Sequence, residues 1–170
     1  LGPGTPGEER AEKLRDLTVD RLFDGMKLRD PTMAECCLAG ILLLHNELDA
    51  SHRYSQGVDT DTGSFWHAIM HRREPDYPNA GFWFRQTGRH PVFPDLGSAA
   101  ADAARSSSAS PEAGFLHEQP EWDPFAFIAY VEAIESGRLG EEDRRLAEAV
   151  QMAEWQLLFD YCYERAVVTG

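Results

Sequence analysis

The chain has 170 residues, of which 29 are acidic and 16 are lysine or arginine, so its formal net charge at pH 7 is −13. This charge disfavours nucleic acids and anionic membranes as partners, because phosphate binding requires clustered lysine and arginine. The best membrane-span candidate, Leu38 to Leu44, is far shorter than the ~20 apolar residues that cross a bilayer. The length suits about one domain, and the oligomeric state is left open.

The cysteines and the first residues predict a cytoplasmic location. Two of the three cysteines are adjacent, and no CxxC spacing occurs, so neither a disulfide framework nor a cysteine metal site is predicted. Reduced, buried thiols are typical of the cytoplasm. Leu1 to Gly7 lacks the apolar run of a signal peptide.

Two helices are predicted in the first third of the chain. A threonine and a proline at Thr5-Pro6 predict the first helix start, and Gly25 ends that helix. Asp30-Pro31 predicts the start of a second helix, which we expect to continue to about Ser55. Its first half is apolar on nearly every side, which predicts a position in the centre of the fold.

The second half of this helix is polar on the face that continues its apolar stripe. His45, Asp49, His52 and Gln56 are spaced by four, three and four residues, so on one continuous helix they share a face. Buried polar groups need partners. The row therefore predicts either a pocket wall or a helix end that emerges into solvent.

A third helix is predicted from Ser64 to Arg73, because Pro75 restricts the residue before it. On this helix His67, His71 and Glu74 are spaced by four and three residues and line one face. Antiparallel packing of the second and third helices would bring the two polar faces together.

The rest of the chain also predicts helices. A short helix should end at Gly88, His90 to Pro94 should be extended, and further helices are expected at residues 96–105, 124–136 and 141–168. No stretch shows sustained strand alternation. We predict one all-α domain over residues 1–170, a bundle of about five to seven helices with an irregular proline-rich segment near residues 75–95 and a mobile surface loop at residues 105–121.

The two polar faces predict a metal site. Zn²⁺ and Fe²⁺ accept imidazole and carboxylate ligands, and histidines four residues apart on a helix can chelate one ion. His67 and His71 have this spacing, although residue 68 is alanine and the HExxH motif is therefore absent. The candidate metal ligands are His45, Asp49, His67 and His71, and a third ligand beside His67 and His71 can also come from His52 or Glu74.

Metal-free acid–base catalysis is the alternative chemistry. A histidine near its ordinary pKa exchanges protons at neutral pH when a carboxylate orients it. The candidate catalytic residues are His52, His71 and Glu74.

The segment from residue 67 to 90 is locally basic, with four arginines against two acids. Such arginines either pair with acids of the fold or face an anionic ligand. The candidate residues for binding a cofactor or ligand are Arg72, Arg73, Asn79, Trp83, Arg85 and His90. In the opposing interpretation, the same residues form a structural clasp that holds residues 75–94 onto the bundle.

One stretch resembles a segment of uncharacterised bacterial and fungal proteins. The resemblance covers Leu44 to Phe93, under a third of the chain, and no activity is attached to it, so it implies no catalytic role. The residues that carry it are Leu44 to His52, Trp66 to Asp76, Asn79, Trp83-Phe84-Arg85, Gly88 and His90-Pro91.

These observations together predict a helical protein with a histidine, carboxylate and arginine pocket between the second and third helices. We expect it to bind a small polar or anionic molecule, and to act as a metal-dependent hydrolytic or acid–base enzyme with Zn²⁺ or Fe²⁺. The alternative is a non-catalytic helical interaction module. We also expect His52 and His71 to lie within one contiguous patch.

Overall fold

The computed structural model describes residues 14, 16–117 and 121–168. In these residues the secondary structure consists of eight α-helices, one 3-10 helix and a single antiparallel bridge between Leu28 and Val167. The predicted all-α fold class is confirmed, with more helices than the five to seven expected. None of the described helices is long and apolar enough to cross a membrane. The predicted helix start at Thr5 lies outside the described residues.

The described residues divide into two compact units. The first unit comprises the described residues up to Gly88 together with those from Phe159 onward, and the second comprises the described residues from Arg89 to Leu158. The predicted single domain over residues 1–170 stays a prediction. The first unit contains α2 (Val19–Leu22), α3 (Pro31–Leu44), α4 (Leu48–Gly57), α5 (Asp61–Arg73), α6 (Tyr77–Thr87) and the last part of α9 (Glu141–Ala166). The second contains α7 (Phe93–Arg105), the 3-10 helix η1 (Pro111–Leu116), α8 (Pro124–Glu135) and the first part of α9.

Aspartate caps begin two of the predicted helices where the sequence places them. The Asp30 carboxylate accepts hydrogen bonds from the backbone N–H groups of Thr32 and Met33 at the start of α3, at 2.9 and 3.3 Å. Asp123 caps α8 in the same way. Each aspartate is followed by a proline, whose fixed φ angle suits the first turn.

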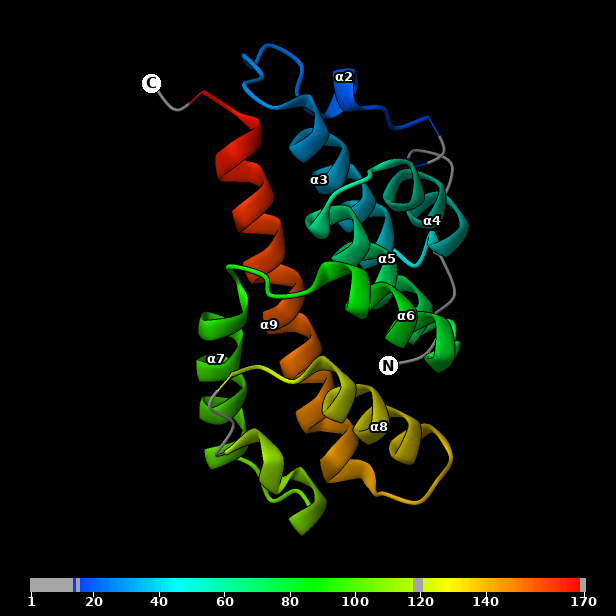
Figure 1. Cartoon of the computed structure of the whole chain (residues 1–170), viewed down its shortest axis with the longest axis vertical. Coiled ribbons are helices and arrows are strands. Elements are labelled where there is room, and N and C mark those ends of the chain that lie inside the picture. Colours follow the sequence, from blue (N-terminus) through cyan, green and yellow to red (C-terminus); the bar gives the residue numbers. More distant parts are fainter. Residues whose placement is uncertain (1–13, 15, 118–120, 169–170) are drawn as a thin grey trace. The chain divides into compact units, whose positions relative to one another are not determined.

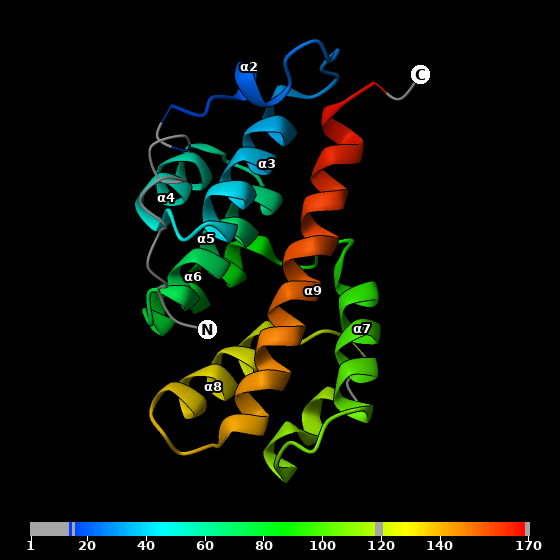
Figure 2. The same cartoon turned by 180° about the vertical axis from the view of Figure 1, so that it is seen from behind.

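Helices α3, α4, α5 and α6 lie side by side in the first unit, as both views show (Figure 1, Figure 2). α3 is buried along most of its length, as predicted. Trp66 of α5 packs against α3 at Gly40, where an added Cβ would lie 2.8 Å from the indole ring. The indole therefore occupies space that any other residue at position 40 would fill.

The predicted second helix is interrupted, which corrects the expectation that it runs to about Ser55. α3 ends at Leu44 and α4 begins at Leu48. Between them Asn46 adopts a left-handed φ of 64°, its N–H donates to the Leu43 carbonyl at 3.1 Å, and the Glu47 N–H donates to the Leu42 carbonyl at 2.9 Å. This is a Schellman motif, and asparagine tolerates its left-handed position better than most residues do.

The region around the prolines is more helical than expected. Residues 90–94 were predicted to be extended, yet α7 begins at Phe93, and Pro94 lies in its first turn. Pro78 similarly lies in the first turn of α6. Both helices therefore use proline at the one place in a helix where the missing N–H costs nothing.

The predicted surface loop at residues 105–121 contains η1, and residues 118–120 lie outside the described part. Ser110 precedes η1, and both its N–H and its hydroxyl donate to the buried Asp143 carboxylate, at 3.1 and 2.6 Å. Tyr130 donates to the same oxygen at 2.7 Å. The mobility of this loop stays a prediction.

A single glycine controls the close approach of α4 and α5. Thr60 caps α5 by accepting from the Gly63 N–H at 3.0 Å. A Cβ at Gly63 would fall inside van der Waals contact with the Val58 carbonyl oxygen and 2.7 Å from the Val58 Cβ. Because backbone cannot move aside as a flexible side chain can, the α4–α5 connection requires glycine here.

Substitution of Gly63 should therefore destabilise the protein even though glycine is a poor helix former. We expect Gly63→Ala to lower the free energy of unfolding by about 1–3 kcal/mol, because the added methyl group overlaps Val58. The matched control is Gly57→Ala, where an added Cβ meets nothing within 4 Å in the last turn of α4. That change should be neutral or stabilise by about 0.4–1 kcal/mol. Equal urea midpoints for the two variants would contradict the argument.

Candidate metal centre

Three histidines from two helices converge in the first unit. His52 comes from α4, and His67 and His71 come from α5. Each offers one ring nitrogen that lies within 4.8 Å of the other two. The ring centroid of His52 lies 4.6 Å from that of His67 and 5.2 Å from that of His71. The expected proximity of His52 and His71 is therefore confirmed.

The geometry of α5 explains why two imidazoles meet. Residues four apart on a helix lie on one face, and the rings of His67 and His71 stack with centroids 4.8 Å apart and an interplanar angle of 20°. The third ring reaches them because the Asn46 turn starts a separate helix, α4, which packs on α5. Ser51 strengthens this placement, since its hydroxyl donates to the Ala39 carbonyl of α3 at 2.9 Å.

His67 is the most deeply placed of the three. Its exposed fraction is 1%, and neither of its ring nitrogens has a hydrogen-bond partner among the described residues. Buried polar atoms without a partner are rare, because each costs about 1–3 kcal/mol. An ion held by the three imidazoles would give one of these two nitrogens a partner.

The surroundings of His67 and His71 favour the neutral forms of these two imidazoles. Burial, and then the neighbouring rings of His71 and His52, lower the pKa of His67 to about 3. Burial and His52 also lower the pKa of His71, against the opposing effect of Asp76. Neutral imidazole is the form that binds a metal, so at neutral pH little proton release is needed before an ion can bind.

Two carboxylates flank the outer side of His71. Its Nδ1 lies 3.5 Å from Glu74 Oε2 and 3.7 Å from Asp76 Oδ2. Carboxylates next to the outer nitrogen of a metal-bound histidine fix the ring orientation and raise its basicity. Glu74 was selected from the sequence as a catalytic candidate, and Asp76 lies only two positions after it.

An aromatic ring covers the cluster on the side of α6. The indole of Trp83 stacks on His67 with ring centroids 4.0 Å apart and an interplanar angle of 25°. Phe82 packs edge-on against Trp83 and is 45% exposed. Trp83, predicted as a ligand-binding residue, thus forms an apolar wall that limits the access of water to His67.

Arg73 has partners other than the carboxylate or anion expected for it. Its guanidinium donates to the Leu43 carbonyl at 2.6 Å and to the side-chain oxygen of Asn46. Burial, and then the nearby Arg72, lower its pKa. Arg73 therefore holds the turn between α3 and α4, which is a clasp, although not the clasp over residues 75–94 that the sequence suggested. Arg72 is fully buried with its guanidinium 6.0 Å from the Phe84 ring centroid.

The remaining candidates lie in other surroundings. His45 caps the end of α3, and Asp49 lies in the first turn of α4, so neither belongs to the three-histidine cluster. Asn79 donates to the Asp76 carboxylate at 2.7 Å at the start of α6. Arg85 is exposed on α6. His90 belongs to the second unit, where its Nδ1 accepts from the Val92 N–H at 3.3 Å.

Comparison with known proteins finds no matching family model, no matching curated protein and no matching solved structure. The resemblance to uncharacterised bacterial and fungal proteins therefore stays a prediction. The geometry of the three-histidine cluster is what indicates a site here.

The lowered pKa of His67 predicts a loss of stability in mild acid. Between pH 6.5 and about 3 the unfolded chain binds a proton at this residue and the folded chain does not, so stability must fall as the pH falls. In chelator-treated protein, urea unfolding at pH 7.0 and 5.5 should show this decrease. The free energy of unfolding of His67→Gln should fall less between these pH values than that of the wild type. His117→Gln, at an exposed position, should show the same decrease as the wild type. Equal decreases in the wild type and His67→Gln would contradict the assignment.

Proposed function

We propose that the chain is a metal-dependent hydrolytic enzyme in which His52, His67 and His71 bind one Zn²⁺ or Fe²⁺ ion. The observation that carries the proposal is the buried ring of His67, whose two nitrogens lack partners inside a group of three mutually close imidazoles. Three protein ligands are the number found in catalytic zinc sites, where a water molecule or the substrate takes the fourth position.

Only a small adjustment is needed to form such a site. Bonds of ~2.0–2.1 Å to a tetrahedral ion require ligand nitrogens that are about 3.3 Å apart, compared with separations of up to 4.8 Å here. His52 is the least buried of the three and comes from a different helix, so rotation of its side chain is the simplest way to close the gap.

The proposed chemistry follows from an open coordination position. A bound Zn²⁺ lowers the pKa of its water to about 7 and supplies hydroxide at neutral pH. Such a site would suit the hydrolysis of a small polar or anionic substrate that contains a carbonyl or phosphoryl group. Glu74, a third exposed and 3.5 Å from His71, would position His71 through its outer nitrogen.

A metal-free acid–base site is the second candidate. It is favoured by the approach of Glu74 and Asp76 to Nδ1 of His71, because a carboxylate orients a histidine that accepts a proton. This candidate needs only His71 and its carboxylates. It leaves both ring nitrogens of His67 without a partner, whereas a bound ion would satisfy one of them.

Metal analysis tests the first proposal. Protein purified without chelator should carry about one equivalent of metal by mass spectrometry, and His52→Ala, His67→Ala and His71→Ala should each lose it, because two imidazoles bind far more weakly than three. His45→Ala is the matched control, since it removes a histidine of the same unit that lies outside the cluster. Its metal content should equal that of the wild type.

Thermal unfolding gives a second readout that does not depend on activity. Zn²⁺ at about 100 times its dissociation constant should stabilise the apo wild type by about 2.7 kcal/mol, and should not stabilise His67→Ala. A wild type that carries no metal and melts identically with and without Zn²⁺ or Fe²⁺ would contradict metal binding. Hydrolytic activity that survives in a metal-free protein but is lost in Glu74→Gln would support the acid–base site.

A further inference from the structure

A cavity lies in the first unit. Its volume is about 550 Å³, within the range of ~300–1,000 Å³ that is typical of small-molecule sites. One wall includes Ala50, which precedes His52 by two residues and so lies on nearly the opposite face of α4. None of the three histidines of the cluster lines the cavity.

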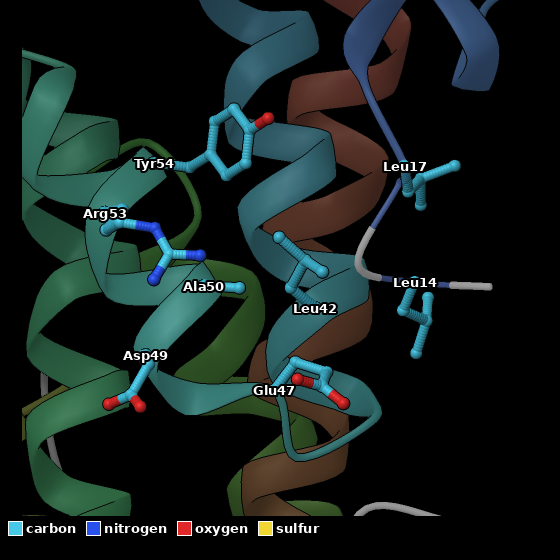
Figure 3. A pocket seen from close by; sticks show the side chains of 8 residues that line it. All are labelled: Leu14, Leu17, Leu42, Glu47, Asp49, Ala50, Arg53 and Tyr54. Atoms are coloured by element: carbon cyan, nitrogen blue, oxygen red, sulfur yellow. The ribbon is translucent and has the colours of Figure 1, made fainter. Parts of the chain in front are cut away.

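The lining combines an apolar surface with charged ends. Figure 3 shows Leu42 of α3 in the middle, the side chains of α4 on one side of it, Leu14 and Leu17 on the other, and Glu47 below it. The apolar lining residues are Leu14, Leu17, Leu42 and Ala50. The polar lining residues are Glu47, Asp49, Arg53 and Tyr54. A molecule that fills the cavity must therefore carry both an apolar group and charged groups.

Glu47 indicates what kind of group the occupant presents at this end. Its Oε1 is buried and has no hydrogen-bond partner among the described residues. The side chain does not cap α4, although Glu47 is the N-cap residue. Glu47 nevertheless lines the cavity, and a carboxylate there is best satisfied by a charged donor, because charge-assisted hydrogen bonds are the strongest. An ammonium group meets this requirement.

Arg53 is the positively charged residue of the lining, and it indicates a negatively charged group on the occupant. It lies six residues after Glu47, about 9 Å along the axis of α4, and its guanidinium extends back toward Ala50 (Figure 3). Side chains on a helix point toward its N-terminus, so the direction of Arg53 shortens the gap to Glu47. A guanidinium recognises a carboxylate through two parallel hydrogen bonds.

We propose that this cavity binds a free α-amino acid with an apolar side chain. The ammonium group donates to Glu47, the carboxylate accepts from Arg53, and the apolar side chain packs against the leucines and the ring of Tyr54. A zwitterion fits because it offers both charges a few ångströms apart on one small molecule. A simple amine would leave Arg53 unpaired, and a simple carboxylic acid would leave Glu47 unpaired.

Calorimetric titration of the full chain with L-phenylalanine tests the proposal. We expect a dissociation constant below about 1 mM. Phenylalaninamide, which lacks the carboxylate, and N-acetylphenylalanine, which lacks the ammonium group, should each bind at least about tenfold more weakly, because each loses one charged pair. Glu47→Gln should abolish the advantage of the amino acid over N-acetylphenylalanine, and Arg53→Gln its advantage over phenylalaninamide.

Matched variants separate this site from general effects. Glu112→Gln and Arg138→Gln make the same chemical changes at exposed positions of the second unit and should bind like the wild type. His67→Ala should also bind L-phenylalanine normally, because none of the three cluster histidines lines the cavity. If neither heat nor NMR shift changes occur at about 10 mM ligand, or if both analogues bind as tightly as the amino acid, the proposal is overturned.

Discussion

The turn at Asn46 is the constraint on which the candidate centre depends. It ends α3, starts α4 in a new direction, and is fixed from outside by the guanidinium of Arg73, which binds both the Leu43 carbonyl and the Asn46 side chain. Arg73 is also the last residue of α5. The helix that carries two of the histidines therefore holds the turn that directs the third histidine toward them.

Close backbone approach is the second requirement for the cluster. Gly40 admits the Trp66 indole between α3 and α5, and Gly63 admits the Val58 carbonyl at the junction of α4 and α5. Both contacts shorten the distance between helices. The polar residues are then free to differ in role: Ser51 hydrogen-bonds to α3, whereas His67 faces its neighbouring rings without a hydrogen bond.

The sequence was informative wherever local chemistry decides structure. Asp30 and Asp123 identified two helix starts, Gly88 identified a helix end, and the spacing of His67 and His71 placed both rings on one face. It failed where tertiary contacts decide. The break at Asn46 interrupts a pattern that is compatible with one long helix, so His45 and Asp49 were grouped with His52 although the turn separates His45 from it. The stacking of Trp83 on His67 also could not be predicted, because it depends on how α6 packs against α5.

The face-to-face contact between Trp83 and His67 gives the protein an optical reporter. Indole emission depends on the charge and polarizability of whatever lies against the ring, and here that neighbour is an imidazole at 4.0 Å. A change in the charge of the His67 ring, such as protonation or the binding of an ion, should therefore change the fluorescence of Trp83, which is one of four tryptophans in the chain. Changes in the charge of the His67 imidazole can thus be followed in real time without an attached dye.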